Sequence, residues 1–173
     1  MFDSVGNLPL HPLVLHAAVI GIPLTLLLSL LFALPMTRSW ARWALPVVAL
    51  GATGATFVAR ESGEALMTAL LTGQQLTTDS AAFALVLRHS QLAGQLMLIM
   101  LAVAVLAVAN AVVVGRVGGT AAQPGRPVRD LVLVALLVVA ALVAAFWVYR
   151  VGDAGANAVW NPTGEQQYST SGG

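Results

Sequence analysis

Four long apolar runs dominate this sequence and leave room for few folds. They cover residues 13–34, 43–59, 92–114 and 131–149, and none contains Lys, Arg, Asp or Glu. A helix needs about 20 apolar residues to cross the hydrocarbon core of a bilayer. Backbone groups in lipid must also form their hydrogen bonds within the protein, which favours helices. The runs therefore predict an all-α integral membrane protein, an antiparallel four-helix bundle.

The composition excludes most soluble classes of protein. Charged residues make up 9% of the 173 residues, whereas a soluble domain carries roughly a quarter. The formal net charge of +1 provides no basic surface for nucleic acid. Without cysteine, the chain has no disulfide, thiolate nucleophile or cysteine-ligated cluster. The lipid bilayer is the partner that this composition requires, and assembly into an oligomer stays open.

Helix-breaking residues divide the chain into one domain and a tail. We predict a four-span domain over residues 1–160 and a flexible C-terminal tail over 161–173. The spans are expected at about 13–34, 41–60, 91–114 and 130–150, with a short separate helix near Glu64–Leu71. Gly51 and Gly54, among Ala49, Ala52 and Ala55, give the second span a small-residue face, which usually marks a close helix contact. No internal repeat stands out.

The arginines predict the orientation. Five of the eight lie in the first and third loops, namely Arg38, Arg42, Arg116, Arg126 and Arg129. Because cytoplasmic loops are enriched in arginine and lysine, these loops are expected in the cytoplasm. Both termini would then be extracytoplasmic, together with all three histidines.

The histidines are the strongest candidates for a site. His11 and His16 are five residues apart, about 140° around a helix, so they cannot share a face. His16 and His89 are expected at similar depths on spans one and three. One histidine from each of two facing helices is a common way to bind haem iron in a bundle. This predicts haem b between His16 and His89 near the extracytoplasmic face, with propionates bound by the arginines of that face: Arg60, Arg88 and Arg150.

Two other interpretations use the same residues. His16 can hydrogen-bond a neighbouring helix while His89 lies among the headgroups, in which case there is no cofactor. Alternatively, His11, Glu64 and Asp153 can bind a metal ion. The corresponding functions are a b-type cytochrome-like electron-transfer subunit, an accessory or scaffold subunit of a membrane complex, and a metal-ion handling protein. Whether the chain is an enzyme stays open.

Several motifs resemble a known family. They are LPLHPLVLH at residues 8–16, SGEAL at 62–66, RHSQLAG at 88–94 and GDAGA at 152–156. Together they resemble small four-span bacterial membrane proteins catalogued as a domain of unknown function. The resemblance implies a bacterial cytoplasmic (inner) membrane. Some relatives are joined to Rieske-type iron–sulfur domains, which implies a respiratory or Rieske-type redox partner. The family often has His where this chain has Asp153, which disfavours a four-histidine site and leaves His16 and His89.

Overall fold

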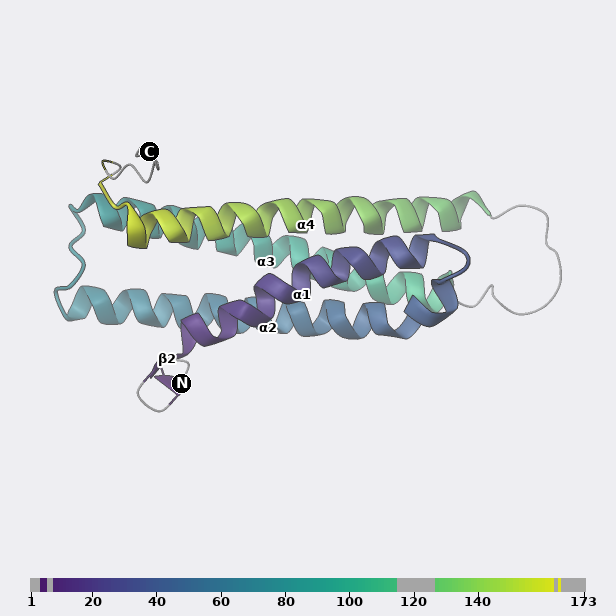
Figure 1. The fold of residues 1–173 in the computed structure, drawn as a ribbon, viewed down its shortest axis with the longest axis horizontal. Coiled ribbons are helices and arrows are strands. Elements are labelled where there is room, and N and C mark those ends of the chain that lie inside the picture. Colours follow the sequence, from purple (N-terminus) through teal and green to yellow (C-terminus); the bar gives the residue numbers. More distant parts are fainter. Residues whose placement is uncertain (1–3, 6–7, 115–126, 164, 166–173) are drawn as a thin grey trace, which may run out of the picture.

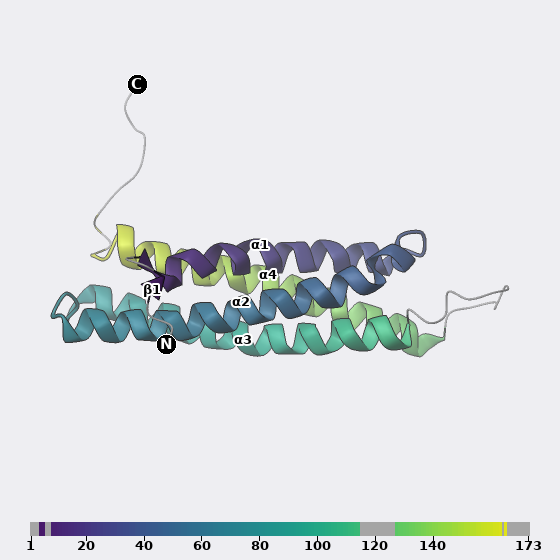
Figure 2. The same cartoon turned by 90° about the horizontal axis from the view of Figure 1, so that it is seen from below.

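Four long antiparallel helices make up the fold (Figure 1). The computed structural model describes residues 4–5, 8–114, 127–163 and 165. The helices are α1 (Leu10–Ala33), α2 (Arg38–Thr72), α3 (Ala81–Val113) and α4 (Val128–Trp160). Two short strands, β1 (Ser4–Val5) and β2 (Leu8–Pro9), pair antiparallel ahead of α1. The predicted all-α four-helix bundle is confirmed, and Figure 2 shows it from a second side.

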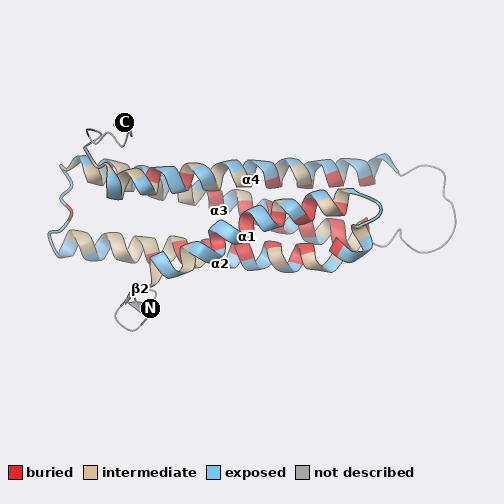
Figure 3. Ribbon diagram, in the orientation of Figure 1, coloured by how far each residue is buried: buried red, intermediate tan, exposed pale blue. Residues whose placement is uncertain are grey.

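Each helix is long and apolar enough to cross a bilayer. Many residues along the helices are exposed (Figure 3), and they include large apolar side chains such as Ile20, Leu98 and Val105. A water-soluble bundle would bury these side chains, whereas lipid accepts them. The chain is therefore a multi-pass membrane protein with four spans.

The helices extend beyond the predicted spans at one end of the bundle. α2 continues to Thr72, so the short helix expected near Glu64–Leu71 is part of α2. α3 begins at Ala81, where the Ser80 hydroxyl accepts a hydrogen bond of 3.2 Å from the backbone N–H of Phe83. We call this end, which holds the start of α1 and α3 and the end of α2 and α4, the histidine end.

Two arginines donate hydrogen bonds to helix carbonyls at the opposite end of the bundle. Arg38 donates hydrogen bonds of 2.9 and 3.1 Å to the carbonyl oxygens of Phe32 and Ala33, at the end of α1. Arg42 donates one of 3.0 Å to the carbonyl of Ala111, near the end of α3. The last carbonyls of a helix lack partners in the helix itself, so these guanidinium groups satisfy them and oppose the negative end of the helix dipole.

The close contact between α1 and α2 lies at Gly21. A β-carbon on Gly21 would stand 2.9 Å from the β-carbon of Ala52, so the two backbones touch there. The small-residue face predicted for the second span makes this contact through Ala52, and not through its glycines, because nothing lies within 4 Å of a β-carbon built on Gly51 or Gly54. Ala49 and Ala52 are both buried. The two glycines, one position before Ala52 and two after it, are on the exposed side of α2.

Candidate functional site

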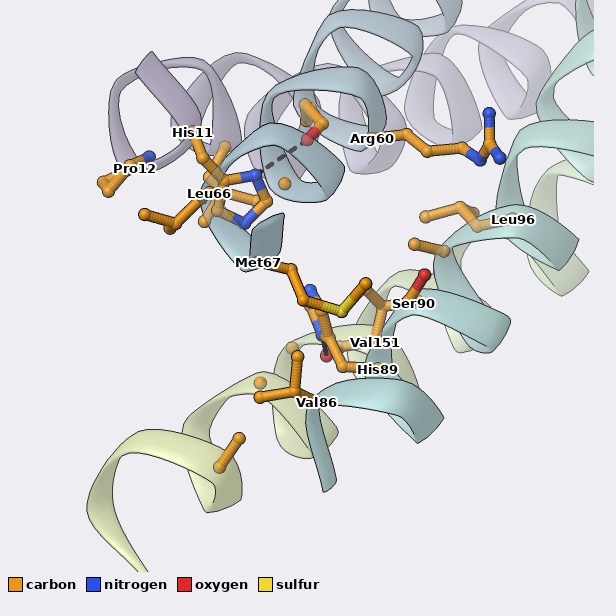
Figure 4. A pocket seen from close by; sticks show the side chains of 18 of the residues that line it. His11, Pro12, Arg60, Leu66, Met67, Val86, His89, Ser90, Leu96 and Val151 are labelled. Carbon is orange, nitrogen blue, oxygen red and sulfur yellow. Dashed lines mark hydrogen bonds between the residues drawn. The ribbon is translucent and has the colours of Figure 1, made fainter. Parts of the chain in front are cut away.

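A cavity of about 420 Å³ lies among the four helices at the histidine end. The bundle is packed most closely within the α1–α2 and α3–α4 hairpins, and these hairpins diverge toward the histidine end in Figure 1. The cavity walls are mainly apolar, with Leu15, Leu66 and Val148 among them. Two histidines, His11 and His89, point into the cavity from opposite hairpins (Figure 4).

The His11 side chain is fixed by α2. Its Nδ1 lies 2.7 Å from the carbonyl oxygen of Ala59. Four residues later, Gly63 lies against the imidazole, and a β-carbon there would stand 3.0 Å from Cε1 of His11. The absence of a side chain at position 63 therefore lets the ring lie flat against α2.

The His89 side chain is fixed by α4 in the same way. Its Nδ1 lies 2.9 Å from the carbonyl oxygen of Val151. Four residues later, a β-carbon on Gly155 would stand 3.0 Å from Cε1 of His89. Each hairpin thus contributes a histidine, a carbonyl on the following helix, and a glycine four residues beyond it. Only these three positions in each hairpin correspond, which is too few to be recognised as a repeat in the sequence.

These hydrogen bonds define which nitrogen of each ring is free. A carbonyl oxygen only accepts hydrogen bonds, so Nδ1 carries the proton in both imidazoles. In the neutral ring Nε2 then has an available lone pair, and neither Nε2 has a hydrogen-bond partner among the described residues. Histidines that bind metals almost always donate their other N–H to a carbonyl or carboxylate. Both rings are therefore prepared to act as ligands through Nε2.

The separation of the rings fits one shared metal ion. Their centroids are 6.2 Å apart and their planes are nearly perpendicular, at 89°. Two metal–imidazole bonds of about 2 Å each, together with the half-width of each ring, account for such a separation. A perpendicular arrangement is compatible with this, because each ring can rotate about its own metal–nitrogen bond.

Of the three arginines predicted to hold propionates, the structure places one at the cavity. The stem of Arg60 lines it, and the guanidinium extends away from both imidazoles (Figure 4). That guanidinium forms ion pairs of 2.9 Å with Glu61 and 2.6 Å with Glu64. Arg88 is exposed, and Arg150 lies over the indole of Trp147 at 5.7 Å from the ring centroid. Neither Arg88 nor Arg150 lines the cavity.

Comparison with known proteins gives the family. The profile of a family described as predicted membrane protein, DUF2231, matches residues 7–166. The chain belongs to the DUF2231 family. No curated protein and no solved structure matches it. The predicted resemblance to a membrane protein family catalogued as a domain of unknown function is thereby confirmed.

In this DUF2231 protein, His16 lies apart from the cavity. Its side chain is exposed, and its Nδ1 lies 3.0 Å from the carbonyl oxygen of Pro12 in its own helix. The structure thus pairs His89 with His11, whereas the sequence favoured His16 as its partner. The difference follows from helix length, because α2 and α3 are longer than the spans predicted at 41–60 and 91–114. Both helices continue outward past His11 and enclose it.

The alternative ion site is also spread apart. His11 and Glu64 both line the cavity, but Asp153 is exposed and its carboxylate accepts a hydrogen bond of 3.2 Å from Asn157. Across the described part of this DUF2231 chain, no three His, Cys, Asp or Glu side chains group as metal ligands would. The sequence assigned no role to Gly63 and Gly155, although both lie within the motifs at 62–66 and 152–156 that carry the family resemblance.

Proposed function

We propose that this protein is a membrane electron-transfer subunit of the b-type cytochrome kind, with haem held between His11 and His89. One observation carries the proposal. Two imidazoles, each with a free Nε2, face one another from separate hairpins at a centroid distance of 6.2 Å. This revises the ligand pair expected from the sequence while keeping its chemistry. The macrocycle would lie between the α1–α2 and α3–α4 hairpins.

The size and lining of the cavity support a macrocycle over a bare ion. A volume of about 420 Å³ falls in the range of small-molecule and cofactor pockets, roughly 300–1,000 Å³. A single ion bound by protein ligands needs far less space. The apolar walls suit a porphyrin face, and Arg60 at the edge can donate to a propionate in place of one of its carboxylates. An alternative is a soft ion such as Cu(I), because the Met67 thioether also lines the cavity.

If His11 and His89 both held a haem iron, electron transfer would be favoured over catalysis. No site for oxygen or substrate would then be left on the metal, so the group would accept and pass on single electrons. The hydrogen bonds to Ala59 and Val151 would fix the ring orientation and the basicity of the ligands. We further propose that the histidine end faces the extracytoplasmic side of a bacterial inner membrane, where a Rieske-type protein is a suitable redox partner.

Absorption spectroscopy tests the proposal. The protein is expressed with a haem precursor, purified in detergent, and measured oxidised and reduced. A Soret band and a reduced α-band are expected in the wild type. Both bands should be lost in His11→Ala and in His89→Ala. His16→Ala is the matched control, since it removes an imidazole from the same helix outside the cavity, and it should keep both bands.

The contrary outcomes are distinct. A wild-type protein without Soret absorbance after haem-supplemented expression would eliminate haem. Copper bound in equal amount to the protein would then support the soft-ion site, and absence of any metal would favour an accessory or scaffold subunit. If His16→Ala removed the bands and His11→Ala kept them, haem would be present, but His16 and not His11 would be its ligand. Circular dichroism of each variant establishes that the helices are intact.

A further inference from the structure

A second depression lies on the lipid-facing side of the bundle, over the seam between α2 and α3. This groove, of about 550 Å³, is lined by six residues: Arg60, Gln91, Gly94, Gln95, Met97 and Leu98. Arg60 alone lines both the groove and the histidine cavity. The two spaces therefore meet at Arg60, and α3 contributes other residues to each of them.

The groove presents amide donors where the bilayer begins. Gln91 and Gln95 are one turn apart on α3, and both are exposed. The Gln95 Oε1 accepts a hydrogen bond of 3.2 Å from the indole N–H of Trp147, which leaves its amide N–H groups to donate elsewhere. Gln91 has no hydrogen-bond partner among the described residues. The amide N–H groups of Gln91 and Gln95 can therefore donate to an acceptor from outside the chain.

Charge decides which kind of acceptor fits. The Arg60 guanidinium pairs with two carboxylates, Glu61 and Glu64, so these three groups together carry no positive charge. A phospholipid phosphate, which is anionic, gains nothing from such a site. A neutral carbonyl oxygen does, because it only needs hydrogen-bond donors. Met97 and Leu98 supply an apolar floor, and Gly94 leaves space beside the amides.

The geometry points to a quinone-binding site: the groove takes the head of a membrane quinone, with its carbonyl oxygens at Gln91 and Gln95 and its tail in the bilayer. This inference rests on the proposed function for its electron route. His89 is two residues before Gln91, about 3 Å along the helix axis. A quinone head in the groove would then lie roughly a helix diameter, about 10 Å, from the haem.

The electron balance is simple. Oxidation of one quinol breaks two O–H bonds and releases two electrons and two protons. The electrons reduce two ferric haems, one in each of two protein molecules, and the protons pass to water at the membrane surface. The quinone remains in the bilayer.

Binding is tested with the full haem-loaded chain in phosphatidylcholine nanodiscs, titrated with a short-chain ubiquinone. Tryptophan fluorescence reports binding, because the Trp147 indole contacts Gln95 at the groove. Saturable quenching is expected in the wild type. A Gln91→Leu/Gln95→Leu variant should bind about tenfold more weakly or worse, since two hydrogen bonds are lost. Gln75→Leu, which removes an exposed glutamine from the α2–α3 loop, is the matched control and should bind as the wild type does.

Equal quenching in the Gln91→Leu/Gln95→Leu variant and in the Gln75→Leu control would overturn the proposed quinone site. Nanodiscs with added phosphatidylglycerol provide a second check. Quinone affinity should not change with the anionic lipid, and competition would show that the groove takes a phospholipid headgroup instead. Because the titration can be repeated on the haem-free chain, absence of a Soret band would eliminate the proposed function while quinone binding would still be measured.

A kinetic measurement tests the electron route. Each molecule of added quinol should reduce two haems, one in each of two wild-type protein molecules, read at the α-band. In the Gln91→Leu/Gln95→Leu variant, reduction by quinol should slow by about tenfold or more, while dithionite still reduces the haem fully. The same rate in both proteins would overturn a route through the groove. Loss of the α-band itself is not expected, because neither glutamine lines the histidine cavity.

Discussion

A β-carbon on Gly155 would stand 3.0 Å from Cε1 of His89, so the ring keeps its position only while residue 155 has no side chain. The His89 ring is also tied to α4 through Nδ1 and the carbonyl of Val151. An added methyl group would push the imidazole into the cavity by a few tenths of an ångström. The position of its Nε2 is thus determined by a backbone atom and by the absence of one carbon.

Gly155→Ala is therefore expected to weaken haem binding by about tenfold, the order of effect seen when groups that orient a metal-binding imidazole are changed. Haem titration of the apoprotein, followed at the Soret band, measures this. Gly54→Ala is the control, because nothing lies within 4 Å of a β-carbon at that position and Gly54 does not line the cavity. Equal affinity in both variants would mean that the glycine does not position the ring.

Haem should also hold the two hairpins together. A ligand that binds only the folded protein raises its free energy of unfolding. The melting temperature in detergent is expected to rise by several degrees on haem loading in the wild type and in His16→Ala. No rise is expected in His89→Ala, which lacks a ligand. A similar rise in His89→Ala would indicate haem bound nonspecifically to the apolar surface.

The contact at Gly21 predicts opposite effects of two glycine substitutions. Gly21→Ala would place its β-carbon 2.9 Å from that of Ala52 and force α1 and α2 apart. We expect a loss of about 1–3 kcal/mol in the free energy of unfolding, typical of overpacking. Gly51→Ala meets no neighbour and should be neutral or stabilising by up to about 1 kcal/mol. Denaturant unfolding in mixed micelles gives both values, and a destabilised Gly51→Ala would contradict the packing.

Orientation can be tested with reporter fusions. A reporter active only in the cytoplasm should be silent when fused after Gly173, because the arginine distribution predicts an extracytoplasmic C-terminus. The same reporter fused after Val114, three spans along the chain, should be active. The reverse pattern would put the histidine end in the cytoplasm and remove the case for an extracytoplasmic redox partner.

The tail is expected to be dispensable. α4 ends at Trp160, and the sequence from Thr163 to Gly173 has no apolar run to bury. Part of this tail lies outside the described residues. Deleting residues 163–173 should leave the helical content and any haem content unchanged, measured by circular dichroism and at the Soret band. Loss of either would give the tail a structural role.

Apolar run length was sufficient to predict the fold but not the site. The hydrocarbon thickness sets how many apolar residues a span needs, so the number of spans and their antiparallel order followed from the sequence. It does not set where a helix ends outside the membrane, and the extensions around Glu64 and Leu85 enclose His11. The angle of about 140° between His11 and His16 shows that they cannot lie on the same face of a helix. It does not show which of the two turns inward. That depends on the packing of α1 against Ala59 and Gly63.

The equivalence of the two hairpins has a consequence for how such a protein arises. Each hairpin carries half of the proposed binding site, and α1 and α3 start from the same end, which is the arrangement expected of two copies related by an axis along the membrane normal. A two-helix ancestor that paired with a second copy of itself would have formed the whole site, with the ligand on the symmetry axis. After gene duplication and fusion, selection would act on the histidine and glycine of each copy. The remaining positions would then be free to diverge. This would account for two hairpins that share a spatial arrangement without a recognisable repeat in the sequence.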